Sequence, residues 1–100
     1  MPISKKLNIS APARRDLRLV GEYTLREWGA VQKKKYLGQI KNGFKLISEN
    51  PGVGKSRDEI DKGLISLAVQ KHIVFYRQTK KQLLVIRILH ESMDLDQHLD

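Results

Sequence analysis

Three consecutive β-rich runs constrain the fold of this 100-residue chain more than any other feature. They are LISLAV (64–69), HIVFYR (72–77) and LLVIRIL (83–89), and the breaks between them are short enough for hairpin turns. Their β-branched and aromatic residues favour strand over buried helix, two states that apolar content alone does not separate. We therefore predict a three-stranded antiparallel meander, whose last two strands are apolar on both faces and need cover on both sides.

The first half of the chain has the period of two helices. Ser10 is a candidate N-cap, and Pro12 fits the first turn because its missing N–H lies among the N–H groups left unpaired there. Gly29 separates the helices, and the NPG segment at 50–52 ends the second one, so we expect an antiparallel hairpin. The stripes that we expect to be buried are Ala13, Leu17, Val20, Thr24 and Trp28 on the first helix, and Tyr36, Leu37, Ile40, Phe44 and Ile47 on the second.

The remaining segments supply a possible extra strand, a loop and a tail. KKLNIS (5–10) alternates weakly in polarity and is typical of a short first strand, whereas GVGKSRDEIDKG (52–63) has no sustained period and indicates a polar loop. The helical hairpin can cover one face of the sheet. The other face is left for the segment 91–100, with Met93 and Leu95 turned back over it, or for a partner.

Length and composition set further limits. The predicted fold class is α+β, an N-terminal strand and a helical hairpin packed on a small antiparallel sheet, in a single domain over residues 1–100. The absence of cysteine excludes disulfides and thiol chemistry. His72, His90 and His98 have no metal-ligand spacing, so we expect no metal and no other cofactor. No membrane-length apolar run and no secretory-type N-terminus occur, so we expect a cytoplasmic protein without membrane contact.

Positive charge is concentrated in the first part of the chain. The formal net charge is +8, of which residues 1–42 carry +7, with ten Lys and Arg against three Asp and Glu. Such a field attracts polyanions, either nucleic acid or an acidic protein. Because the sequence has no glycine-rich phosphate loop and no evident aromatic platform, we do not expect sequence-specific nucleic-acid binding.

Four segments carry a family resemblance. They are DLRLVGEYTLREWG (16–29), NPGVG (50–54), RDEIDKGLISLAVQKHIVFYR (57–77) and LLVIRILHESMD (83–94). Together they strongly resemble the ParE toxins of the RelE/ParE superfamily, which are the toxic halves of bacterial type II toxin–antitoxin modules. The resemblance spans nearly the whole chain and is most specific at "GL…S…V…H.VFYR" and "R.LH..MD". It implies a helical hairpin packed on a small antiparallel sheet, with the first strand paired into that sheet.

The resemblance implies two alternative activities. ParE-like members poison DNA gyrase by protein contact, and RelE-like members are ribosome-dependent endoribonucleases that cut mRNA. Members of both kinds are silenced by an antitoxin whose acidic, flexible C-terminal part wraps the toxin. The nuclease branch usually adds a lysine-rich stretch before the sheet and a catalytic Tyr or His near the C-terminus. Here the corresponding loop mixes both charges, and His98 is the only aromatic ring after His90. We therefore expect a non-enzymatic gyrase inhibitor in a hetero-oligomer with a ParD-like antitoxin, and keep the RelE-like nuclease as the alternative.

The nuclease alternative would use Arg77, Arg87 and His90. Cleavage by the 2′-OH needs a group that activates the hydroxyl, positive charge for the phosphorane and an acid for the leaving oxygen, and histidine titrates near neutrality. In the competing interpretation, which we favour, the strand ends at His90 and its imidazole bonds a neighbouring backbone. The two arginines lie inside apolar runs, where a charge is costly unless paired, so we expect Glu91 or Asp94 as partners.

The antitoxin interpretation selects a different set of residues. Leu19 and Tyr23 lie off the buried stripe of the first helix, and Leu46 points away from that of the second. An acidic antitoxin could place apolar anchors beside these residues and carboxylates beside the basic ones. The gyrase-contact surface is not assigned from the sequence. The candidate antitoxin-binding residues are Arg14, Arg18, Leu19, Tyr23, Lys34, Lys35 and Leu46.

Overall fold

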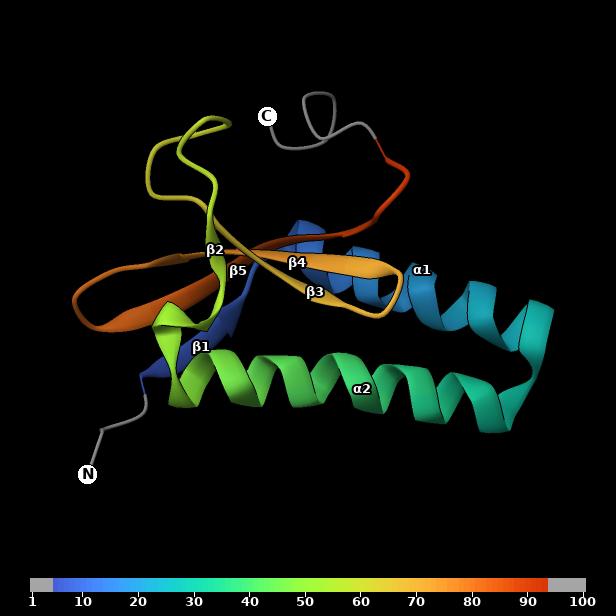
Figure 1. Cartoon of the computed structure of the whole chain (residues 1–100). Helices are drawn as coiled ribbons and strands as arrows, with labels where there is room; N and C mark the ends of the chain where they lie inside the picture. Colours follow the sequence, from blue (N-terminus) through green and yellow to red (C-terminus); the bar gives the residue numbers. More distant parts are fainter. Residues whose placement is uncertain (1–4, 94–100) are drawn as a thin grey trace.

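The computed structural model describes residues 5–93 and contains two helices packed against one five-stranded sheet (Figure 1). Helix α1 (Ala11–Trp28) and helix α2 (Ala30–Glu49) run antiparallel on one face of the sheet. The sheet has the strand order β1-β5-β4-β3-β2. Its strands are β1 (Lys6–Ile9), β2 (Lys55–Ser56), β3 (Ile65–Val69), β4 (His72–Gln78) and β5 (Gln82–His90), and the 3-10 turn η1 (Pro51–Val53) precedes β2. The predicted α+β class, with its hairpin packed on a sheet, is confirmed.

The helix ends follow the local sequence signals. The hydroxyl oxygen of Ser10 accepts a hydrogen bond from the N–H of Ala13 at 3.1 Å, and the same hydroxyl donates to the carbonyl of Ile86 at 2.8 Å. The N-cap of α1 therefore also fixes the helix start beside β5. Gly29 has a φ of 90°, a backbone conformation that favours glycine, and forms the one-residue turn between the helices.

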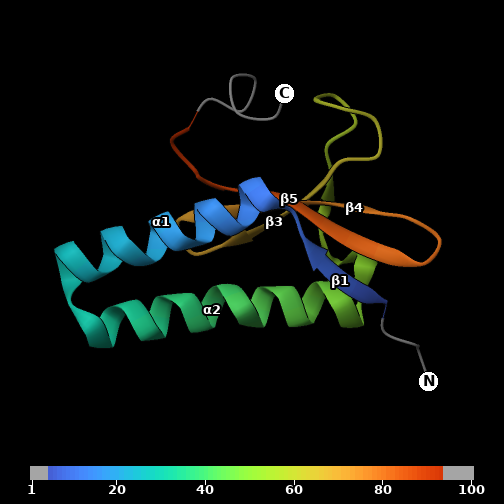
Figure 2. The ribbon, with the colours of Figure 1, turned by 180° about the vertical axis from the view of Figure 1, so that it is seen from behind.

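The predicted antiparallel meander is confirmed for β3, β4 and β5. Strand β1 adds to it in parallel, pairing from Lys6 with Gln82 to Ile9 with Val85, so the sheet is mixed (Figure 2). A parallel pair needs a long crossover connection, and here the chain passes through the helical hairpin and strands β2, β3 and β4 before it returns as β5. Strand β2 was missed in the segment that we read as a loop, because two residues are too few to show an alternating pattern.

Both faces of β4 and β5 are covered. The main core lies between the sheet and the helices, and its buried residues are Ala13, Val20, Ile40, Phe44, Ile47, Val74, Tyr76, Leu83, Val85 and Ile88. On the opposite face, Phe75 and Leu89 pack with Leu64 and with the partly buried Ile60. The loop before β3 thus supplies cover that we had assigned to the tail or to a partner. Met93, which we expected over that face, instead lines a hollow beside α1, and Leu95 lies outside the described residues.

The segment after α2 is fixed by one buried tyrosine. Tyr76 of β4 is fully buried in the main core, and its hydroxyl donates to the carbonyl of Pro51 at 2.8 Å. The same oxygen accepts a hydrogen bond from the N–H of Gly54 at 3.1 Å. Two backbone groups of the turn are therefore satisfied from within the core.

One core prediction was wrong. Trp28 continues the apolar stripe of α1, but it is 71% exposed. The turn end of the helical hairpin extends past the strands, so the stripe is buried only where the helix lies over the sheet (Figure 1). Conversely, Asp16 and Gly21 are buried although neither belongs to that stripe. Within residues 5–93, neither helix has the length and apolar content needed to cross a membrane.

Candidate functional site

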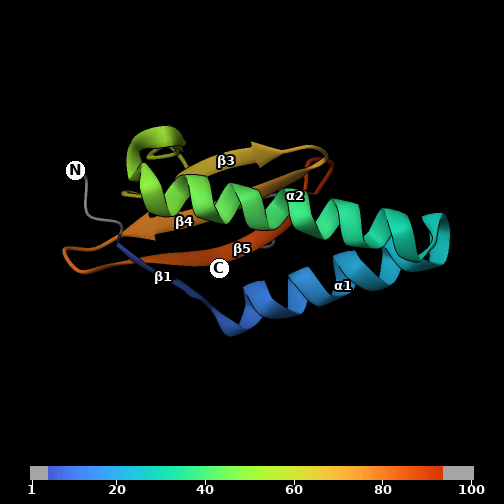
Figure 3. The ribbon, with the colours of Figure 1, turned by 90° about the horizontal axis from the view of Figure 1, so that it is seen from below.

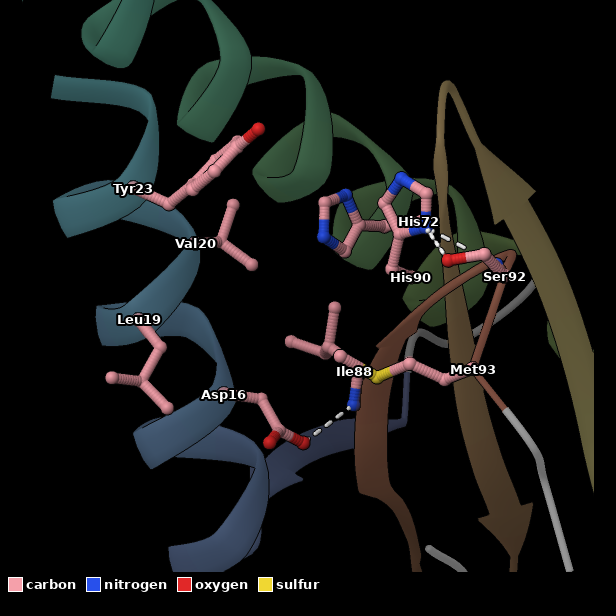
Figure 4. A pocket seen from close by; sticks show the side chains of 9 residues that line it. All are labelled: Asp16, Leu19, Val20, Tyr23, His72, Ile88, His90, Ser92 and Met93. Atoms are coloured by element: carbon pink, nitrogen blue, oxygen red, sulfur yellow. Dashed lines mark hydrogen bonds between the residues drawn. The ribbon is translucent and has the colours of Figure 1, made fainter. Parts of the chain in front are cut away.

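A cleft of about 380 Å³ lies between helix α1 and the adjacent ends of β4 and β5 (Figure 4). Its helical wall has side chains at positions i, i+3, i+4 and i+7, which share one face of a helix. These are Asp16, Leu19, Val20 and Tyr23. The opposite wall is formed by His72, Ile88, His90, Ser92 and Met93.

The cleft is mainly apolar and its rim is open. Leu19 is 50% exposed, Tyr23 54% and Met93 44%, although all three are large apolar or aromatic side chains. Exposed apolar side chains gathered around a hollow are typical of a surface that a partner covers. Two of the candidate antitoxin-binding residues, Leu19 and Tyr23, lie together in the wall of this cleft.

Asp16 is the first residue of the helical wall of the cleft, and it is buried. Its carboxylate accepts hydrogen bonds from Nε and from a terminal nitrogen of Arg87, at 2.7 and 2.9 Å, and from the N–H of Ile88 at 3.0 Å. These bonds to Asp16 raise the pKa of the Arg87 guanidinium. The carboxylate also satisfies an edge N–H of β5 beyond the end of β1. Sequence reasoning missed Asp16, and the only signal was an acidic residue in the strongly basic first half of the chain.

Glu91 pairs with neither arginine, so that part of the expectation was wrong. Arg87 is paired with Asp16, and Arg77 is paired with Asp61 of the loop before β3. Glu91 instead lies 3.8 Å from the ammonium of Lys71. Asp94 lies outside the described residues. The general expectation that both arginines need carboxylate partners is nevertheless confirmed.

Two histidines in the cleft form a connected pair. The rings of His72 and His90 meet edge to face, with centroids 5.3 Å apart. Nδ1 of His72 is 2.7 Å from the hydroxyl of Tyr36, and the same hydroxyl accepts a hydrogen bond from the N–H of Lys71 at 3.1 Å. Burial lowers the pKa of His72, and the nearby His90 lowers it further.

His90 ends β5, as predicted. Its Nδ1 accepts a hydrogen bond from the N–H of Ser92 at 3.1 Å and lies 2.7 Å from the hydroxyl of Ser92. The backbone donor leaves Nδ1 unprotonated, so the proton of the neutral ring is on Nε2. The predicted contact between this imidazole and a neighbouring backbone group is therefore confirmed. Across residues 5–93, no three His, Cys, Asp or Glu side chains are grouped closely enough to hold a metal ion.

The residues of the nuclease alternative are spread along the sheet. In the strand ladder Arg77 lies opposite Leu84, whereas Arg87 lies opposite Phe75. Three residues of strand correspond to about 10 Å, so the two arginines are well separated along the sheet. Neither arginine lines the cleft that contains His90.

The other predicted antitoxin residues lie on separate surfaces. Arg14 and Arg18 line a groove between the two helices. Lys34 and Lys35 line a shallow hollow on α2. Leu46 is 44% exposed but lines neither the cleft, the groove nor the hollow. The sequence patterns thus located exposed side chains correctly, but did not show how they are grouped.

The helical hairpin on a small mixed sheet resembles the fold found in solved toxin–antitoxin systems. The solved structure of the chromosomal ParDE system from P. aeruginosa matches with a TM-score of 0.77 and 18% identity, covering 89% of this chain and 98% of that one. The family model "ParE toxin of type II toxin-antitoxin system, parDE" matches residues 7–95. Toxin ParE1 of Mycobacterium tuberculosis is 32% identical over 98 residues, covering 97% of this chain and all of the relative. Toxin ParE of Escherichia coli is 35% identical over 88 residues, covering 87% of this chain and 85% of the relative. The chain belongs to the ParE toxin family.

Proposed function

We propose that this toxin inhibits bacterial DNA gyrase by protein contact, without cutting a nucleic acid, and that a ParD-like antitoxin neutralises it. The observation that carries the proposal is that the side chains an RNase would need are already bonded to other residues of the chain. Arg87 is held by Asp16, Arg77 is held by Asp61, and Nδ1 of His90 accepts a hydrogen bond from Ser92.

A ribonuclease site would need these groups to be available. Its cations must face a developing phosphorane, and its general base must offer a lone pair within reach of the 2′-OH. His90 offers an N–H at Nε2, and its lone pair at Nδ1 is already used. The ion pairs of Arg77 and Arg87 direct the two guanidinium groups to different carboxylates. This geometry favours inhibition by contact over chemistry.

The antitoxin part of the proposal rests on shape and charge. The cleft offers apolar surface at Leu19, Tyr23 and Met93, and the separate groove between the helices, on another side of α1, offers the basic side chains of Arg14 and Arg18. An acidic segment that wraps around α1 could place apolar side chains in the cleft and carboxylates against the arginines. The P. aeruginosa relative was solved as a ParDE toxin–antitoxin system. We therefore propose a hetero-oligomer with an antitoxin in the cytoplasm, where gyrase also acts.

A gyrase reaction tests the main proposal. Purified toxin is added to gyrase, ATP and relaxed or supercoiled plasmid, and the products are treated with SDS and protease. We expect linear DNA to accumulate with toxin concentration, because a trapped cleavage complex releases broken DNA. A folded toxin that leaves both supercoiling and plasmid integrity unchanged would refute gyrase inhibition.

The variant His90→Gln separates this proposal from the nuclease alternative. Ribosome-dependent mRNA cleavage by His90 should fall by a factor of about 100 or more when its proton-transfer group is removed. Gyrase inhibition should be retained if the melting temperature is retained. Toxicity lost together with mRNA cleavage, at an unchanged melting temperature, would favour the nuclease.

Introduction of a negative charge into the cleft tests the antitoxin site. We expect Leu19→Glu to weaken binding of the ParD-like antitoxin of the same module by about 10-fold or more, because a carboxylate would replace an apolar contact and repel the acidic partner. Leu25→Glu is the matched control, since Leu25 is 45% exposed on the same helix but does not line the cleft. Equal effects of the two variants in calorimetric titration would refute the placement of the antitoxin.

A further inference from the structure

The turn end of the helical hairpin exposes more apolar surface than its own packing explains. Val31 is 86% exposed and Trp28 71%, the two highest values among the large hydrophobic side chains of residues 5–93. They lie on either side of the Gly29 turn, which extends past the strands (Figure 3). An exposed tryptophan is a costly feature for a free protein and is the residue type most often found at the energetic centre of an interface.

Basic residues lie next to this apolar surface on the same face of α2. Val31, Lys34, Lys35 and Gly38 occupy positions i, i+3, i+4 and i+7, and together they line a shallow hollow. Among the described residues, neither lysine forms an ion pair. We call the set Trp28, Val31, Lys34, Lys35 and Gly38 the hairpin end.

Gly38 is an independent indication that a partner molecule lies close against helix α2. Glycine inside a helix costs about 1 kcal/mol relative to alanine, so it needs a reason. At Gly43 the reason is packing, because an added Cβ would lie 2.8 Å from Val69. At Gly21 an added Cβ would lie 3.2 Å from Lys33. At Gly38 an added Cβ would meet nothing within 4 Å. Nothing within the described chain requires this glycine, whereas a partner lying against the helix would.

We propose that the hairpin end is the surface through which this toxin contacts its protein target, an inference that rests on the proposed gyrase inhibition. The target presents an apolar pocket that receives Trp28, edged by carboxylates that face Lys34 and Lys35. A second copy of this chain is a poor occupant, since the same lysines would face each other. Nucleic acid is the competing occupant, since Trp28 offers a stacking surface and Lys34 and Lys35 offer phosphate contacts, but it would leave the apolar surface of Val31 without a complementary group. The cleft that we assign to the antitoxin is lined by other residues, from α1 and the strand ends.

The test compares three variants in the gyrase reaction. Trp28→Ser with Val31→Ser should raise the toxin concentration needed for half-maximal linear DNA by about 10-fold or more. Gly38→Ala should raise that concentration too, while it raises the melting temperature. Lys45→Ser is the matched control, since it places a serine on α2 about 21 Å from Val31 and breaks only an exposed pair with Glu49. The control should behave as the wild type.

The outcomes of these assays distinguish between the partners that could bind the hairpin end. Unchanged gyrase inhibition by the double variant, at an unchanged melting temperature, would overturn the proposal. Weaker binding of the ParD-like antitoxin would assign the hairpin end to the antitoxin instead, and an equal loss of affinity for a 20-base-pair DNA without gyrase would assign it to DNA. If the wild-type toxin yields no linear DNA and leaves supercoiling unchanged, the gyrase proposal itself fails. Growth arrest in cells then tests the hairpin end separately: arrest by the wild type and not by the double variant supports a contact with another target, and equal effects overturn it.

Discussion

Removal of the Asp16 carboxylate should be the most damaging single change outside the apolar core. The carboxylate is about nine-tenths buried and accepts two hydrogen bonds from Arg87 and one from the backbone of Ile88. Asp16→Ala removes two hydrogen bonds from the Arg87 guanidinium and the acceptor of the Ile88 N–H. Breaking a buried ion pair from one side costs about 3–5 kcal/mol, and the partial exposure of Arg87 places this case near the lower end. We expect a loss of about 3 kcal/mol, which corresponds to a fall in melting temperature of roughly 12–24 °C.

Denaturant unfolding of a double-mutant cycle measures this contribution. The cycle comprises Asp16→Ala, Arg87→Met and the double variant, and we expect a coupling energy of about 1–3 kcal/mol. Glu22→Ala is the control, because the Arg18–Glu22 pair is 3.9 Å long with both side chains more than half exposed, and should cost less than about 0.5 kcal/mol. A cost below about 1 kcal/mol for Asp16→Ala, or additive effects in the cycle, would refute the reasoning.

Three further predictions concern the core and the histidine pair. Tyr76→Phe should lower the free energy of unfolding by about 1–3 kcal/mol, measured by urea titration, because a backbone amide and a backbone carbonyl lose their partner. Gly43→Ala should lower the melting temperature, because its Cβ would lie 2.8 Å from Val69, and an unchanged value would show that the helix shifts without cost. His72 has a lowered pKa, mainly through burial and then through His90, so its neutral form is favoured in the fold. Its contribution to stability should be complete above its ordinary pKa of about 6.5 and be lost as the pH falls through the lowered value, so urea titrations at several pH values should show a steeper acid loss for the wild type than for His72→Asn.

Much of the fold could be predicted because its signals are local. The meander follows from three β-rich runs with short breaks, and the helices follow from an apolar period, a serine cap and a glycine turn. Strand β2 could not be predicted, because two residues carry no period. The parallel direction of β1 could not be read from KLNI itself, since the direction depends on where the chain returns after the hairpin.

The candidate site was only partly predictable. Leu19 and Tyr23 were identified because an apolar residue off the buried stripe is visible in the sequence. Asp16 was missed because its partner, Arg87, is 71 positions away. The groups of the nuclease alternative were each visible, but their separation required knowledge of the strand ladder.

The sequence by itself determined the elements, their order, the family and the two-faced burial of β4 and β5, because periodicity and propensity act between near neighbours in the chain. Tertiary structure alone decided which charges are paired, which residues form the cleft and that Trp28 is exposed. Those features depend on distances across the fold: β1 places the start of α1 beside β5, so that Asp16 reaches Arg87, and the hairpin is longer than the sheet that covers it.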